Sequence, residues 1–350
     1  MKKIIFSEEI NHAIAHCMSK DKNMVCYGLG TTDPKGVFDT TFNLEKKFGK
    51  HRVFDVPSSE NALTGISIGL ALKGIRSVVT HQRMDFFFLA FDQLINAAAK
   101  WYYMFGQKTS IPITIRLIVG RGWGQGPTHS QSFQSMLSSV PGLKVVMPSL
   151  PENAKSLLIS SILDPNPVVF IEHRWLHGTV GKNNESKLKK NEHEKSIILN
   201  KGNQLTIISM SYMTLEALRA LKKLPSDIRK KIEILDLISI KPLDKKKIIN
   251  SVKKTGRVLI LDTGPKTNSI SSEIISIINE NIFNYLKSAP ERLCLPDYPE
   301  PTGYSLTKNF YNNSNNVLIK IKKILNLKKI SLVDLPLHHD VPGDWFKGPF

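Results

Sequence analysis

Short apolar runs alternate with segments of helical periodicity along most of this chain, and this alternation limits the possible folds more than any other feature. In the first half, such runs cover residues 23–29, 76–80, 112–119, 143–147 and 167–172. Runs that are apolar on both faces are typical of parallel strands with helices on both sides of the sheet. The alternation therefore predicts an α/β protein built from three-layer α/β/α units with mainly parallel sheets.

A polar, charged stretch interrupts the alternation once, near the middle of the chain. At 350 residues the chain is also too long for one ordinary hydrophobic core, so two domains are expected. The strand and helix pattern resumes at residue 204. We therefore expect a first domain over 1–180, a linker over 181–202, a second domain over 203–329 and a C-terminal tail over 330–350.

Composition argues against several classes of protein. Hydrophobic residues make up 41% of the chain, and no apolar run approaches the roughly 18 residues that a membrane helix needs. Acidic residues follow the basic N-terminus before an apolar signal-peptide core can form, so a cytoplasmic protein is expected. Cys17, Cys26 and Cys294 are too far apart for a metal-ligand spacing or a disulfide framework, and buried, unreactive thiols are expected.

The formal net charge of +18 allows two interpretations. A strongly basic protein can bind nucleic acid or an acidic partner, whereas a lysine-rich composition can also arise without any such function. The lysines are widely spread, and no basic run alternates with aromatic residues as a base-stacking surface would. The charge favours the compositional interpretation and leaves a non-catalytic assembly or nucleic-acid-binding protein as a distant alternative.

One glutamate opens a predicted helix that is otherwise apolar and small. Ser59 is a predicted N-cap, and Glu60 lies in the first turn of the helix predicted over 60–73. Glu60 either interacts with the helix end or is a carboxyl in a low-polarity site, where burial raises a carboxyl pKa toward neutrality. The helix alone does not decide between these two roles.

A glycine-rich segment over 120–131 follows another predicted strand. Ligands of open parallel sheets gather at the carboxyl ends of strands, so His129 in this segment is a candidate catalytic residue, although loop histidines are often simple surface residues. Phe86, which opens the helix predicted over 86–106, could pack in the core or stack on a ligand ring. The sequence contains neither a P-loop nor a metal–diphosphate segment, so any diphosphate cofactor requires a second chain.

Several of these segments resemble one known family. The residues that carry the resemblance are 59–60 with 65–69, 91–100, 102–104, 128–132, 141–146, 241–244 and 251–257. They are similar to the β subunits of thiamine diphosphate-dependent 2-oxo acid dehydrogenases, over about residues 1–310. The resemblance implies a pyrimidine-binding transketolase-like domain, followed by a transketolase C-terminal domain.

The resemblance also implies partners and cofactors. Such β subunits pair with an α subunit that holds Mg²⁺ and the diphosphate of the cofactor, usually as two α and two β chains with a contact between the β chains. The substrate would be a small 2-oxo acid, and a lipoyl acyltransferase is a further candidate partner. The expected reaction is decarboxylation of the 2-oxo acid followed by acyl transfer.

Family positions give roles to individual residues of this chain. Glu60 aligns with the carboxyl that contacts a pyrimidine ring nitrogen of the cofactor, and His129 aligns with the histidine that faces the reacting carbon. Phe86 aligns with the residue that stacks near the aminopyrimidine, and Leu29 is a further cofactor-binding candidate. A structural potassium site found in several members aligns with Ile113, Ser161, Ile162, Asp164 and Asn166.

Two segments depart from the family pattern. The run over 80–86 contains Arg83 and an added acidic residue, and the loop after the strand over 112–119 contains Arg121, Trp123 and Gln125. In the family these positions line or approach the substrate funnel, so the four side chains are substrate-pocket candidates. They fit a bulkier or anionic substrate, which leaves open the β half of a split transketolase-like or carboligating enzyme.

Overall fold

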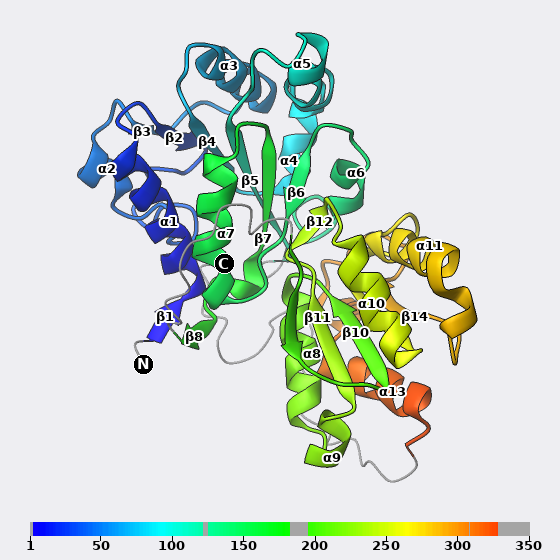
Figure 1. Cartoon of the computed structure of the whole chain (residues 1–350). Helices are drawn as coiled ribbons and strands as arrows, with labels where there is room; N and C mark the ends of the chain where they lie inside the picture. The colour runs from blue at the N-terminus through cyan, green and yellow to red at the C-terminus, as the bar shows by residue number, and fades with distance from the viewer. Residues whose placement is uncertain (1–2, 122–124, 183–194, 308, 328–350) are drawn as a thin grey trace.

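The computed structural model describes residues 3–121, 125–182, 195–307 and 309–327, which form two α/β units side by side (Figure 1). The larger sheet belongs to the first unit. Its strands, in spatial order, are β12 (Ser239–Lys241), β6 (Lys144–Val146), β7 (Val168–His173), β5 (Ile113–Val119), β4 (Ser77–His81), β2 (Val25–Gly28) and β3 (Val53–Phe54). All of its strand pairs are parallel except the pair of β12 with β6.

Helices cover both faces of this sheet. One face packs on α1 (Phe6–Lys20), α2 (Leu44–Phe48) and α7 (Pro151–Leu163), and the other packs on α3 (Glu60–Leu72), α5 (Ala99–Met104) and α6 (Gln134–Ser138). Every residue of β5 is buried, because its side chains point alternately into these two layers. The predicted α/β fold with mainly parallel sheets is confirmed.

The second unit contains a smaller sheet that is also mainly parallel. Its strands, in spatial order, are β14 (Glu291–Leu295), β13 (Val258–Pro265), β10 (Leu205–Ser209), β11 (Ile232–Asp236) and β9 (Ile197–Asn200). The longer helices of this unit are α8 (Tyr212–Lys222), α10 (Lys245–Thr255), α11 (Ile270–Ile282) and α13 (Ser314–Leu325). Shorter helical elements of this unit are α9 (Ser226–Arg229), η5 (Phe283–Tyr285) and α12 (Tyr304–Thr307), whereas η3 (Arg174–Leu176) follows β7 in the first unit.

The structure corrects the predicted linker over 181–202. Strand β8 (Val180–Lys182) enters this range and pairs with β1 (Lys3–Ile5), and β9 also lies within the range and pairs with β11. Residues 183–194 of the predicted linker and the predicted tail over 330–350 lie outside the described residues. Both strands are short and lie at sheet edges beside charged residues, so the sequence shows no clear apolar run at either place.

The helix predicted over 86–106 changes its hydrogen-bonding pattern along its length. It comprises α4 (Met84–Phe87), the 3₁₀ turn η1 (Phe88–Ala90), the π-helix η2 (Asp92–Ala98) and α5. π-Helical turns are rare and often lie near functional sites. Apolar periodicity predicts a helix here, but it does not distinguish α, 3₁₀ and π hydrogen bonding, which differ in the carbonyl to which each amide donates. Among the described residues, no helix is both long and apolar enough to cross a bilayer.

A buried ionic network joins the central strands of the larger sheet. Arg116 on β5 donates to both carboxylate oxygens of Glu172 on β7, over 2.6 and 3.0 Å, and both side chains are 0% exposed. His177 Nε2 lies 3.0 Å from Glu172 Oε2, and Arg116 also donates to the hydroxyl of Thr40 over 2.8 Å. Burial by itself raises the pKa of Glu172, but the charge and hydrogen bonds of Arg116 together with the hydrogen bond of His177 outweigh burial and hold the pKa below its usual value.

A second buried carboxyl joins the two units. Asp236 at the end of β11 accepts hydrogen bonds from the hydroxyls of Ser149, over 2.6 Å, and Thr214, over 2.9 Å. Ser149 belongs to the first unit, just before α7, and Thr214 lies on α8 of the second. Burial raises the pKa of Asp236 from 3.8 to about 7.

Because the pKa of Asp236 is higher in the folded chain than in the unfolded chain, the contribution of Asp236 to the free energy of unfolding should fall as the pH rises from about 4 to 7. Between about pH 4 and pH 7 the unfolded chain has an ionised Asp236, whereas the folded chain keeps the carboxyl protonated, so folding is favoured most at the lower pH. Asp236→Asn is neutral throughout and removes this dependence. We expect urea unfolding to show the variant gaining stability relative to the parent protein from pH 4 to pH 7. A constant difference across this range would contradict the assignment.

Candidate active site

Four of the predicted site residues lie at the same edge of the larger sheet. Leu29 directly follows β2, Glu60 opens α3 after β3, Phe86 lies in α4 after β4, and His129 lies in the segment after β5. These strands are neighbours in the order β3, β2, β4, β5, and they run parallel, so their carboxyl ends share one edge. This is the edge at which open parallel sheets bind ligands.

Glu60 is a buried carboxylic acid at the first turn of α3. The residue is 6% exposed, and among the described residues no side chain or amide donates a hydrogen bond to its carboxyl oxygens. Ser59 lies at the N-cap, but it makes no side-chain capping bond, which corrects the expectation from the sequence. A buried carboxyl without a protein donor can accept a hydrogen bond from a ligand, because burial without a partner is costly.

Phe86 and His129 contact each other across the strand ends. Their ring centroids are 5.2 Å apart, with an interplanar angle of 88°. His129 Nδ1 lies 3.0 Å from the Thr128 hydroxyl, and the His129 amide donates to the carbonyl of Gly126 over 3.1 Å. Because Thr128 engages Nδ1, the other ring nitrogen, Nε2, is the one suited to exchange a proton with a ligand.

An exposed apolar face lies beside Glu60 on the outer side of α3. Ile66 is 54% exposed, and a Cβ placed on Gly69 would meet no atom within 4 Å. Leu89 of η1, which packs beside α3, is 70% exposed. Large exposed apolar residues gathered on neighbouring elements are typical of a surface that binds another protein.

The substrate-pocket candidates have protein partners. Arg83 donates to the carbonyl of Gly120 over 2.9 Å and to Gln125 Oε1 over 2.5 Å. Arg121 is 1% exposed and donates to the carbonyls of Pro301 and Thr302. The structure therefore assigns Arg121 to a contact between the two units, which differs from the predicted place in a substrate funnel. Trp123 lies outside the described residues.

The predicted potassium ligands gather near the opposite edge of the sheet, and most of their carbonyls already have protein donors. Arg76 donates to the carbonyl of Ile162, and it donates to the carbonyl of Asp164 over 2.9 Å. Thr114 donates to the carbonyl of Ser161 over 3.2 Å. Because the Arg76 guanidinium already supplies a positive charge to two of the carbonyls, the group fits a potassium ion poorly.

Some residues near the strand ends belong to no recognisable sequence motif. Phe38, in the segment after β2, has a positive φ of 50°, which is uncommon for a bulky residue. The guanidiniums of Arg174 and Arg83 lie 4.2 and 5.4 Å from the centroid of its ring. Phe38 and Arg174 come from distant segments, and neither belongs to a motif, so only the tertiary structure brings them together.

Comparison with known proteins gives the family of the chain. Residues 2–178 match the family described as transketolase, pyrimidine binding domain, and residues 194–317 match transketolase, C-terminal domain. The pyruvate dehydrogenase E1 component subunit β of Porphyra purpurea is 37% identical over 333 residues, which cover 94% of this chain and 99% of that protein. The chain belongs to the family of pyruvate dehydrogenase E1 β subunits.

Other members of the E1 β-subunit family and a solved structure agree with this assignment. The subunit of Acholeplasma laidlawii is 33% identical over 307 residues, which cover 88% of this chain and 91% of that protein. A structure named split gene transketolase, inactive β4 tetramer, has a TM-score of 0.73 at 19% identity and covers 93% of this chain and 99% of its own. At that identity the structural likeness shows the fold alone. The resemblance to the E1 β family found in the sequence is confirmed.

Proposed function

We propose that this chain is the β subunit of a thiamine diphosphate-dependent 2-oxo acid dehydrogenase, and that Glu60 activates the cofactor. The observation that carries the proposal is the buried Glu60 carboxyl, which has no donor among the described residues and shares a sheet edge with the Phe86–His129 contact. These residues fit the aromatic pyrimidine end of the cofactor, since they offer one carboxyl acceptor and one partly exposed aromatic ring. Leu29, half-buried at the same sheet edge, would add apolar contact.

Thiamine diphosphate, when bound, supplies an electron sink for loss of carbon dioxide from a 2-oxo acid. Glu60 would hold a proton at a pyrimidine ring nitrogen, for which a carboxyl in a low-polarity site is suited. Phe86 would pack against the ring and orient it. His129 would hold or deliver a proton at Nε2 near the reacting carbon, because Thr128 engages Nδ1.

The proposal requires an α subunit. Because the sequence contains no metal–diphosphate segment, the partner would hold Mg²⁺ and the diphosphate. The exposed face of α3, with Ile66 and the open position at Gly69, is the surface that fits this partner and lies next to Glu60. An assembly of two α and two β chains, with a contact between the β chains, is the form that we propose.

Several finer expectations remain predictions. A lipoyl acyltransferase as acyl acceptor follows from the dehydrogenase function. A structural potassium ion would have to share the carbonyls of Ile162 and Asp164 with the Arg76 guanidinium. The cytoplasmic location also stays a prediction, since one relative, from Arabidopsis thaliana, is named mitochondrial.

A second candidate function is the β half of a split transketolase-like or carboligating enzyme. The observation that favours it is the pair formed by Arg83 and Gln125 beside the strand ends, where the family pattern has small uncharged residues. A charged, hydrogen-bonded side chain at this place suits a bulkier substrate, or one with a second anionic group, better than pyruvate, which has a single carboxylate. Glu60, Phe86 and His129 would have the same roles in this enzyme.

Reconstitution with an α subunit tests the proposal. Mixed with that subunit, thiamine diphosphate and Mg²⁺, the chain is expected to release carbon dioxide from a 2-oxo acid and to transfer the acyl group to lipoamide. Transfer to an aldehyde instead would support the carboligating enzyme. Gly69→Trp should prevent assembly, because the bulky side chain fills the open surface of α3, and its melting temperature should match that of the parent chain.

A matched variant and a binding assay complete this test. Glu280→Trp places the same side chain on an exposed position of α11, away from α3, and should assemble normally. Normal assembly of Gly69→Trp would contradict the proposed partner surface. Salt-dependent binding to duplex DNA, together with no cofactor binding in the α-containing mixture, would favour the non-catalytic alternative.

A further inference from the structure

A segment of the second unit packs on the loop that carries His129. Arg121, just after β5, donates through its two terminal nitrogens to the carbonyls of Pro301, over 3.0 Å, and Thr302, over 2.6 Å. The indole of Trp175, after β7, donates to the Arg121 carbonyl over 2.7 Å. Arg121 is therefore held by its backbone to the first unit and by its guanidinium to the second.

A glycine brings the same segment into contact with the backbone of His129. A Cβ placed on Gly126 would lie 2.1 Å from the Thr302 hydroxyl oxygen, so the two residues approach as closely as a glycine allows. The carbonyl of Gly126 accepts the hydrogen bond from the His129 amide over 3.1 Å. A shift of Thr302 would therefore allow the turn that ends at His129 to shift too.

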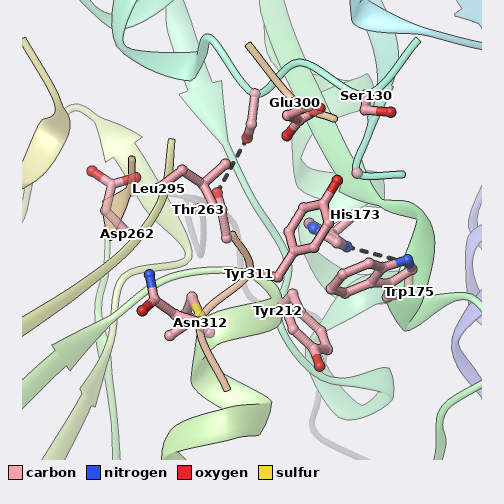
Figure 2. Close-up of a pocket in the computed structure, with 13 residues that line it drawn as sticks. Ser130, His173, Trp175, Tyr212, Asp262, Thr263, Leu295, Glu300, Tyr311 and Asn312 are labelled. Carbon is pink, nitrogen blue, oxygen red and sulfur yellow. Dashed lines mark hydrogen bonds between the residues drawn. The ribbon is translucent and has the colours of Figure 1, made fainter. Parts of the chain in front are cut away.

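The loop also faces the second unit across a small cavity, on the far side of His129. Ser130 and Glu300 line one cavity of about 20 Å³ between the units, and Figure 2 shows them close together at its upper edge. Both residues are buried. Next along the chain, the Gln131 side chain donates to Asp85 Oδ1 over 2.6 Å, and Asp85 precedes Phe86.

We propose that Arg121 is a positioning residue. Its guanidinium binds residues 300–302 of the second unit, and this interaction, which we call the clasp, fixes the backbone from which His129 reaches the reacting carbon. This inference rests on the proposed role of His129. The clasp acts through the close approach of Gly126 to Thr302 and through Ser130 and Glu300, which line one cavity; Gly126 and Ser130 flank His129 on both sides. The planar guanidinium suits this task because it reaches two carbonyls at once, whereas a lysine ammonium is a single point charge.

The kinetic test uses Arg121→Ala and Arg121→Lys in the complex with the α subunit. If the clasp positions His129, kcat should fall about a hundredfold in the alanine variant, because small displacements of a catalytic group have effects of this size. KM for the 2-oxo acid should stay near the parent value. Lysine should restore only part of kcat, and added guanidinium ion should restore part of kcat in Arg121→Ala.

A second readout does not depend on activity. In Arg121→Ala, hydrogen exchange at the amides of His129 and Gln131 should become faster, while exchange in β10 and β13 should remain as slow as in the parent protein. Arg257→Ala is the matched control, because Arg257 also donates to a backbone carbonyl, that of Gln204, at the amino-terminal edge of the smaller sheet. It should change neither exchange in the loop nor kcat.

The outcomes separate the clasp from the proposed function. A raised KM with unchanged kcat would overturn the clasp and return Arg121 to direct substrate binding, and unchanged exchange in the loop would overturn the clasp as well. If the parent complex has no decarboxylase activity, the proposed function fails while exchange still tests the clasp. If Arg121→Ala does not fold, Gly126→Ala, which pushes on Thr302 and leaves Arg121 intact, should show the same faster exchange and lower kcat.

Discussion

Glu60→Gln is expected to abolish turnover in the complex with an α subunit and to leave the fold intact. Glutamine has nearly the same shape, so the buried first turn of α3 should pack as before. Its amide cannot exchange a proton with a ring nitrogen as a carboxyl does. Loss of such a group lowers kcat by about 10² to 10⁴. Steady-state release of carbon dioxide measures the effect, and the melting curve checks the fold.

The control for this variant is a glutamate at an equivalent place in another helix. Glu273 lies in the first turn of α11 and is exposed, so Glu273→Gln tests the helix-end role without a ligand site. A first-turn carboxylate contributes about 0.3 to 1 kcal/mol to helix stability, and both variants should lose no more than this. Near-normal turnover in Glu60→Gln would leave Glu60 only the helix-end role and would contradict the proposed function.

Arg116→Met is expected to cause the largest loss of stability. The substitution removes the positive partner of Glu172 while the carboxylate remains fully buried beside His177. Removing one member of a buried ion pair costs about 3 to 5 kcal/mol, because the remaining charge then has neither water nor an opposite charge beside it. Urea unfolding of the full chain at neutral pH measures the free energy, with circular dichroism as the signal.

The paired variant shows whether the unpaired charge causes this loss. Arg116→Met combined with Glu172→Gln removes both charges, and we expect it to be more stable than Arg116→Met alone. The distances of 2.6 and 3.0 Å from the guanidinium to the two carboxylate oxygens make this the best-formed buried pair on β5 and β7 among the described residues. If Arg116→Met lowers the free energy of unfolding by less than about 1 kcal/mol, the effect would be no larger than that of an exposed ion pair, and it would contradict this account.

Much of the candidate site could be predicted from sequence order alone. In a parallel sheet, every segment that follows a strand starts at the same edge. The order of strands and loops in the sequence therefore places Leu29, Glu60, Phe86 and His129 at one edge. The contact between the rings of Phe86 and His129 agrees with that placement. What the sequence could not predict is the direction of long side chains, since Arg121 turns away from this edge to Pro301 and Thr302.

The sequence by itself determined the α/β class, the mainly parallel sheets and the family, because all three depend on the order and spacing of apolar runs and short motifs. Only the tertiary structure decided which distant groups meet. Strand β12 returns from the second half to pair with β6 in the larger sheet, and Asp236 reaches Ser149 of the first unit. Arg116 on β5 pairs with Glu172 on the neighbouring strand β7. Such contacts depend on how the chain packs in three dimensions, and local periodicity contains no record of that packing.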